Sequence, residues 1–136
     1  MNNRIKVTFL ILVLVQGLHS IEEYVGRLWE VFPPARFLTG LVSENNETGF
    51  LIINIGLFIF GIGCWLLILR TNQLFVAGVI WFWIAIEAIN GVGHLIWSLS
   101  EKGYTPGTAT APVLLILAIY LAQQRLHIAS GEDLTA

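Results

Sequence analysis

The chain has 136 residues, of which 56% are hydrophobic and only 12% are charged, and its formal net charge is −2. Soluble domains carry roughly 25% charged residues, so this composition excludes a soluble globular protein and predicts an integral membrane protein that lies in a lipid bilayer. The net charge is too small to indicate a nucleic-acid partner. The length suits one compact domain.

Four apolar stretches predict an all-α fold, a four-helix transmembrane bundle, because a transmembrane helix needs about 20 mostly apolar residues. The expected spans cover about residues 5–29, 49–69, 74–99 and 106–123. Pro33 and Pro34 end the first span, since proline cannot continue a helix, and Pro106 suits the first turn of the last span. We therefore expect a single four-helix membrane domain over residues 1–136, with 124–136 as a polar tail.

The first span carries ionisable residues directly behind an apolar run, residues 7–15. At about 100° per residue, positions i, i+3, i+4 and i+7 share one helix face, and here they hold His19, Glu22, Glu23 and Gly26. Ionisable side chains inside a membrane are costly, face the bundle interior and usually carry function. We therefore predict that this face lines a buried site.

The third span has a similar polar stripe in an otherwise apolar segment. Glu87, Asn90, Gly91 and His94 follow one another at i, i+3, i+4 and i+7, so they also share one face. Two predicted membrane helices thus each present a histidine, at least one glutamate and a glycine on a single face.

The depths of the two stripes match. With a rise of about 1.5 Å per residue, His19 lies about 21 Å along its span, and Glu87 and His94 lie about 20 Å and 30 Å along theirs. The supporting polar residues expected at a compatible depth are Asn54 in the second span, Asn90 in the third, and Thr108 and Thr110 at the start of the fourth. The pattern predicts one site between the first and third spans.

A cluster of carboxylates in a low-dielectric site needs compensation by shared protons, a cation or a metal. Arg27, at the edge of the first stripe, supplies one charge at most. Imidazole and carboxylate together suit Zn, Fe or Mn, so we expect a divalent metal, Zn or Fe. The predicted ligands are His19, Glu22, Glu23, Glu87 and His94, with Glu22 and Glu23 as the catalytic candidates. A proton or ion relay without metal and a purely structural polar cluster stay open as alternatives.

The distribution of lysine and arginine favours both termini in the cytoplasm, because short cytoplasmic flanks are enriched in these residues. In that orientation the inner side holds Arg4, Lys6, Arg70 and Arg125, and the outer side holds Arg27, Arg36 and Lys102.

The string His19-Ser20-Ile21-Glu22-Glu23 resembles the signature of the HXXEE-domain family of small integral membrane proteins, which has no established activity. The likeness extends to Pro33-Pro34 after the first helix, to Asn90-Gly91-x-x-His94, and to residues 104–111 at the entry to the last helix. The resemblance implies a four-helix membrane protein with a metal or catalytic centre, and it supplies no substrate.

These residues support three hypotheses about function. The first is a metal-dependent enzyme that acts on a lipid-like substrate. Hydrolysis fits zinc and oxidation fits iron, and hydrolysis is favoured because membrane desaturases use many more histidines than the two in these stripes. The second is a transport module that binds protons or cations. The third is an accessory, cofactor-holding subunit of a larger membrane complex. A homo-oligomer is compatible with all three.

Overall fold

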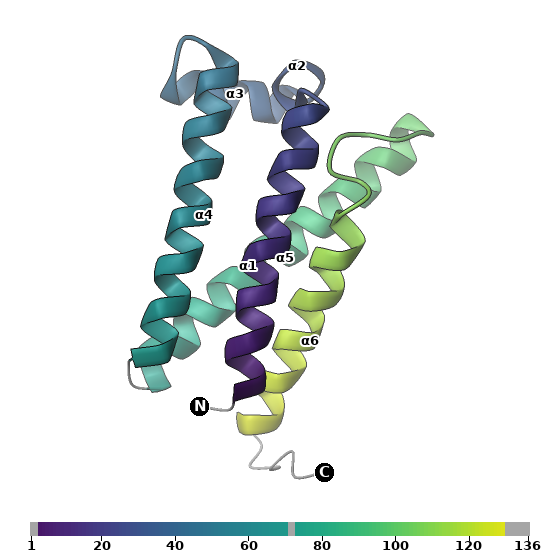
Figure 1. Cartoon of the computed structure of the whole chain (residues 1–136). Coiled ribbons are helices and arrows are strands. Elements are labelled where there is room, and N and C mark those ends of the chain that lie inside the picture. The colour runs from purple at the N-terminus through teal and green to yellow at the C-terminus, as the bar shows by residue number, and fades with distance from the viewer. Residues whose placement is uncertain (1–2, 71–72, 130–136) are drawn as a thin grey trace.

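The computed structural model describes residues 3–70 and 73–129 of the chain, and helices occupy most of this range (Figure 1). The elements are α1 (Asn3–Val25), α2 (Leu28–Val31), α3 (Pro33–Val42), α4 (Asn46–Arg70), α5 (Gln73–Glu101) and α6 (Ala111–Ala129). No strand occurs in the described residues. The expected all-α fold class is confirmed.

Three of the described helices are long and apolar enough to cross a membrane: α1, α4 and the part of α5 from Phe75 to Glu101. The fourth expected span is not among them. α6 ends with Gln123, Gln124 and Arg125 in its last turns, so its apolar part, residues 111–122, covers only roughly 18 Å at about 1.5 Å per residue. A bilayer core is about 30 Å thick. The four-helix transmembrane bundle therefore stays a prediction.

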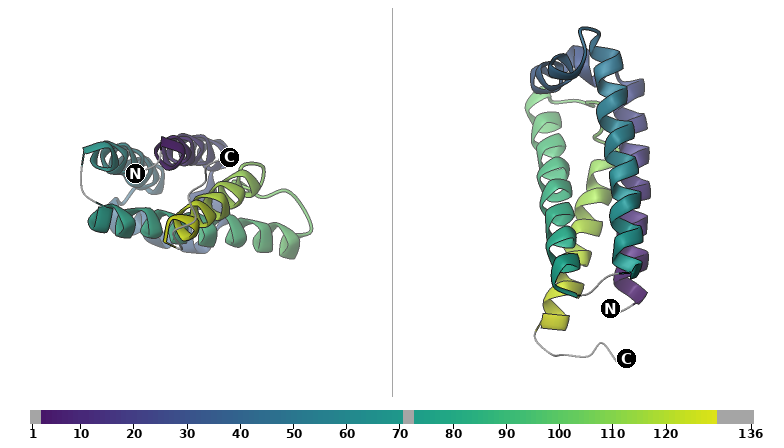
Figure 2. Two further views of the ribbon diagram at one scale, coloured as in Figure 1. Left: turned by 90° about the horizontal axis from the view of Figure 1, so that it is seen from below. Right: turned by 90° about the vertical axis from the view of Figure 1, so that its left-hand side faces the viewer.

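The long helices form two layers, α1 beside α4 and α5 beside α6 (Figure 2). α1 packs against both α4 and α6, and α5 packs mainly along α6. α4 and α5 are antiparallel, but they diverge above their connection and share few contacts, so they are not the close neighbours that the short link predicts (Figure 1). The main core fills the half nearest that connection and includes Phe9, Leu12, Val13, Cys64, Ile80, Trp83 and Leu114.

The first helix ends earlier than the expected boundary at residue 29. α1 stops at Val25, and Arg27 adopts a left-handed backbone conformation with φ 51° before α2 begins. Gly26 permits the close approach of Pro106 at this point, because a Cβ on residue 26 would lie 2.5 Å from the proline ring. Pro33 then starts α3, in the first-turn position that suits proline. α2 and α3, which the sequence did not predict, lie across one end of the molecule (Figure 1).

The segment between α5 and α6 positions the site. After α5 the chain runs back toward the middle of the molecule before α6 begins (Figure 1). α6 therefore starts at Ala111, later than the expected Pro106. Non-helical backbone at membrane depth is tolerated only where protein groups satisfy it. The Ala111 N–H donates to the Gly107 carbonyl at 3.0 Å, and side chains of α1 satisfy other groups of this segment.

Candidate metal centre

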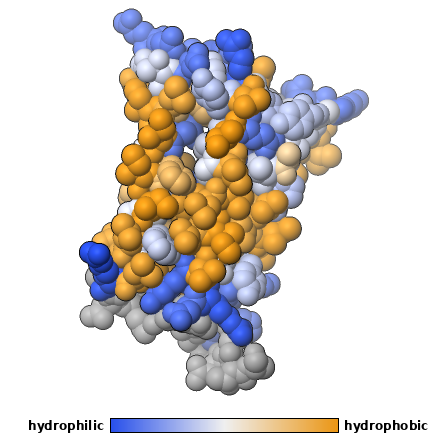
Figure 3. Space-filling model, viewed as in Figure 1, coloured by the Kyte–Doolittle hydropathy of each residue, from blue (hydrophilic) through white to orange (hydrophobic). Residues whose placement is uncertain are grey.

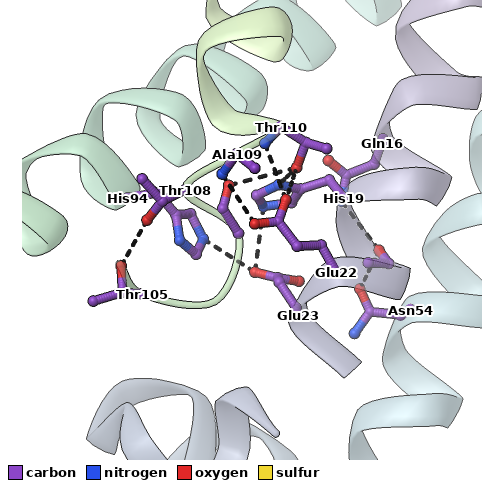
Figure 4. A network of polar contacts seen from close by, with 12 residues as sticks. Gln16, His19, Glu22, Glu23, Asn54, His94, Thr105, Thr108, Ala109 and Thr110 are labelled. Atoms are coloured by element: carbon purple, nitrogen blue, oxygen red, sulfur yellow. Dashed lines mark hydrogen bonds and ion pairs between the residues drawn. The ribbon is translucent and has the colours of Figure 1, made fainter. Parts of the chain in front are cut away.

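His19 and Glu23 of α1 and His94 of α5 form a compact buried group (Figure 4). His94 Nε2 lies 3.0 Å and His19 Nε2 lies 3.3 Å from the same oxygen, Glu23 Oε1. One ligand atom of each residue lies within 4.8 Å of the others. The exposed fractions are 0% for His19 and 7% for each of the other two. Three of the five predicted ligands therefore meet at one point.

The hydrogen bonds of His19 define its tautomer. Nδ1 lies 2.7 Å from Thr110 Oγ1, and the Thr110 hydroxyl donates its single proton to Glu22 Oε2 at 2.6 Å. Nδ1 must then donate to Thr110, so Nε2 of the neutral ring carries a lone pair. That lone pair faces a carboxylate oxygen, and Nε2 has no hydrogen-bond partner among the described residues. His19 Nε2 and Glu23 Oε1 are therefore two acceptors that lie 3.3 Å apart, and such a pair needs a proton or a cation between its atoms.

Glu22 is turned away from this group and holds the start of α6. Its carboxylate accepts hydrogen bonds from the backbone N–H groups of Ala109 at 2.9 Å and Thr110 at 3.0 Å. It also accepts from the hydroxyls of Thr110 at 2.6 Å and Tyr104 at 2.7 Å. Glu22 therefore satisfies the backbone of the turn that leads into α6, and it also fixes Thr110 behind His19.

Glu87 is fully buried on α5 but belongs to a different set of contacts. Gln16, with its amide nitrogen facing Glu87, donates to Oε2 at 2.9 Å, and Asn90 interacts with the same carboxyl group. The other end of the Gln16 amide lies 3.4 Å from Ser20 Oγ. Ser20 in turn donates to Asn54 at 2.7 Å. A polar chain thus leads from Glu87 across α1 to α4.

Some of the remaining predicted residues contact the buried group of His19, Glu23 and His94, and others do not. Thr110 bonds to His19, whereas Thr108 pairs with Thr105 at 2.7 Å. Arg27 supplies no charge to the site, because its left-handed turn directs it to an exposed ion pair with Glu30 at 2.6 Å.

Gly107 is a site residue whose role sequence reasoning missed. Its φ is 93°, and a Cβ at this position would lie 2.5 Å from His94 Cε1 and 2.8 Å from His19 Cε1. The backbone of Gly107 therefore packs directly on both imidazole rings. The signal was present in the pair Pro106-Gly107, which marks a turn, although residues 104–111 were expected only to lead into the last helix.

A family model described as "Protein of unknown function with HXXEE motif" matches residues 10–121, which is most of the chain. The match contains all three residues of the buried group and the segment that covers them. No curated protein and no solved structure matches the chain.

Proposed function

This chain belongs to the family of proteins of unknown function with an HXXEE motif, and from the geometry of its buried group we propose that it is a membrane-embedded, metal-dependent hydrolase of lipid-like substrates. The observation that carries the proposal is the convergence of His19 Nε2 and His94 Nε2 on Glu23 Oε1 between two apolar helices. A lipid-like substrate follows from the position of the group, because its surroundings are apolar helices that face the bilayer.

The donor set favours a divalent transition metal over a shared proton. Two imidazole nitrogens and one carboxylate oxygen suit Zn or Fe and leave coordination positions open, as in catalytic sites. Metal-binding histidines usually donate their second ring N–H to a neighbouring acceptor, and His19 Nδ1 has Thr110 in that position. The unpaired Nε2 of His19 supports the same conclusion.

Hydrolysis is the reaction class that this arrangement fits best. A bound zinc lowers the pKa of water to about 7. In hydrolysis the water oxygen would bond to the acyl carbon, the bond from that carbon to the leaving oxygen or nitrogen would break, and the proton that the water loses would pass to the leaving alcohol or amine. Glu22 already accepts hydrogen bonds from the chain just before α6, and Glu23 is one of the three proposed metal ligands. We therefore assign the proton transfer to Glu87, the remaining buried carboxyl group.

The proposal includes four helices in the bilayer with both ends of the chain in the cytoplasm. The start of α1 and the end of α6 lie at the same end of the molecule (Figure 1). Arg4 and Lys6 in the first turns of α1, Arg70 at the end of α4 and Arg125 in α6 belong to that end, which agrees with cytoplasmic enrichment of positive charge. Reporter fusions at both termini that are active only in the cytoplasm are expected, and a periplasmic or luminal signal at either end would contradict this topology.

The metal content of the detergent-purified protein tests the central proposal. Near-stoichiometric Zn or Fe is expected in the wild-type chain, and its loss in His19→Ala, His94→Ala and Glu23→Gln. His127→Ala is the matched control, because His127 is an exposed histidine in the last turn of α6, and it should keep the metal. A wild-type protein with intact helical content and no more metal than His19→Ala would overturn the proposal.

A proton-conducting role is the second candidate, and the contiguous carboxylate and imidazole groups of His19, Glu23 and His94 favour it. Chains of such groups relay protons in membrane transporters. The transport hypothesis predicts proton or cation flux in liposomes that Glu23→Gln abolishes. Sealed vesicles without flux above the protein-free background would exclude it.

A further inference from the structure

We propose that a pocket between α1, α4 and α5 binds the neutral ester or amide group of an acyl lipid next to Glu23. This inference rests on the proposed function, since it names the substrate class of the same site. The pocket has a volume of about 350 Å³ and is lined by residues of α1, α4 and α5. α4 and α5 diverge above their connection (Figure 1). Glu23, a member of the buried metal-ligand group, forms part of its wall.

The polar lining of the pocket is made of carboxamides. Gln16, Asn54 and Asn90 come from three different helices and line the pocket together with Glu23. Asn54 uses its oxygen to accept from Ser20 and one N–H to donate to the Phe50 carbonyl at 3.0 Å, which leaves a second N–H. Carboxamides both donate and accept, so they match the carbonyl and N–H or hydroxyl groups of a neutral lipid.

The charge of the lining argues against an anionic headgroup. None of the described residues that line this pocket is cationic, and Glu23 contributes a negative charge. Apart from a metal bound by Glu23 and the two histidines, a phosphate or free carboxylate there would find no cationic partner, because the lining holds neither arginine nor lysine. Burial of an unpaired charge is strongly unfavourable. The lining therefore selects a neutral ester or amide.

The rest of the lining provides a path for an acyl chain. Leu57, Ile86 and Ile89 form the apolar walls, and Ile89 is 74% exposed on the outer surface of α5. An adjoining pocket of about 230 Å³ shares Ile89 and Asn90 and reaches His94. On the face that Figure 3 shows, the outer sides of α1 and α4 are apolar, and hydrophilic residues lie in the depression between them. A lipid can therefore enter sideways from the bilayer with its polar group directed at Glu23 and His94.

Photo-crosslinking of the full chain in phosphatidylcholine nanodiscs tests this assignment. The probe is a monoacylglycerol with a diazirine in its acyl chain, and the crosslinked residues are mapped by mass spectrometry. We expect labelling of Leu57, Ile86 and Ile89 that excess unlabelled monoacylglycerol displaces and phosphatidic acid does not. Ile89→Trp, which fills the pocket from an exposed position, should lower this labelling roughly ten-fold, the equivalent of about 1.4 kcal/mol of binding.

The matched control is Ile96→Trp, because Ile96 is 61% exposed on the same helix two turns further along and does not line this pocket. It should leave the labelling unchanged. Equal displacement by phosphatidic acid would overturn the neutral substrate class. Displaceable labelling at Leu14 or Ile55, in the apolar groove between α1 and α4, or no displaceable labelling at all, would overturn the pocket.

The metal content of the same samples separates this inference from the proposed function. A metal-loaded protein without displaceable labelling contradicts the pocket alone. A metal-free, folded protein that still labels at Leu57, Ile86 and Ile89 contradicts the metal centre and leaves the lipid pocket standing.

Discussion

His19 is held at one ring nitrogen, Nδ1, and its other nitrogen, Nε2, is buried without a hydrogen-bond partner among the described residues. Thr110 fixes the Nδ1 side, Glu22 fixes Thr110, and Nε2 is left facing Glu23. Groups that orient a ligand are often worth a factor of about 10 to 100 in metal affinity. Thr110 is therefore a positioning residue, although it has no atom in the proposed ligand set.

Thr110→Val tests this role, because valine keeps the shape and the backbone N–H of threonine and removes only the hydroxyl. We expect metal affinity to fall by roughly 10- to 100-fold, with little change in helical content, in a competition titration against a chelator. Thr108→Val is the matched control, since the Thr108 hydroxyl pairs with Thr105 and not with a histidine. An equal loss of affinity in both variants would indicate a general loosening of the loop and would contradict the positioning role.

Glu22 links the start of α6 to Tyr104, and this contact predicts a pH dependence. The hydrogen bond to the Glu22 carboxylate favours the protonated phenol and raises the pKa of Tyr104 from its ordinary value near 10 to about 12. Because the folded pKa is the higher one, the contact stabilises the fold below pH 10 and is lost as the pH rises through about 12. Tyr104→Phe should remove this part of the alkaline destabilisation, as followed by circular dichroism.

Glu22→Gln provides the converse test. The substituted amide replaces one acceptor oxygen by an NH₂ group, so some of the backbone N–H and hydroxyl donors around Glu22 lose their acceptor, and the free energy of unfolding should fall. The phenol titration of Tyr104 should move back toward its ordinary pKa, as read from tyrosine absorbance. Glu30→Gln, in an exposed ion pair with Arg27, is expected to change stability little. A Glu22→Gln variant with unchanged stability and an unchanged Tyr104 titration would contradict this role of Glu22.

At the scale of elements, the segment from Lys102 to Thr110 closes the site on the side of α6. It returns into the molecule, places Gly107 on both imidazole rings and is satisfied by Glu22. An alanine at 107 would adopt a strained positive φ, which costs about 1–3 kcal/mol, and would also push the rings apart.

Gly107→Ala should therefore lower thermal stability and reduce metal binding together. Gly63→Ala is the matched control, because a Cβ at Gly63 in α4 meets nothing within 4 Å. Alanine in a helix is favoured over glycine by about 1 kcal/mol, so this variant should be as stable as the wild type or more so. A Gly107→Ala protein with wild-type metal affinity would show that the loop does not contact the rings as described.

Helix periodicity explains which parts of the site could be predicted from the sequence. The stripes that carry His19, Glu23 and His94 depend only on local spacing, and their helices place them together. Whether Glu22 or Glu23 joins the group depends on where α6 starts, more than 80 residues away in the chain. The re-entering loop and the break of α1 at Gly26 also depend on tertiary packing, here against Pro106, so local patterns could not reveal them.

At the scale of the whole molecule, the two-layer arrangement gives the site one closed and one open side. α6 and its entry loop cover the His19 side, whereas one pocket lies beside Glu23 and an adjoining pocket lies beside His94. The visible face of α1 and α4 is largely apolar (Figure 3). The architecture therefore suits chemistry on a molecule that approaches from the bilayer.

X-ray absorption spectroscopy of the protein loaded with one equivalent of zinc tests the central claim most directly. We expect a centre with two imidazole nitrogens at about 2.0–2.1 Å and carboxylate oxygen at about 2.0–2.2 Å. This spectrum should be lost in both His19→Ala and His94→Ala, which should not hold the zinc, and should be unchanged in His127→Ala. A zinc spectrum without imidazole scattering, or one that both histidine variants leave unaltered, would contradict a metal held by His19, Glu23 and His94.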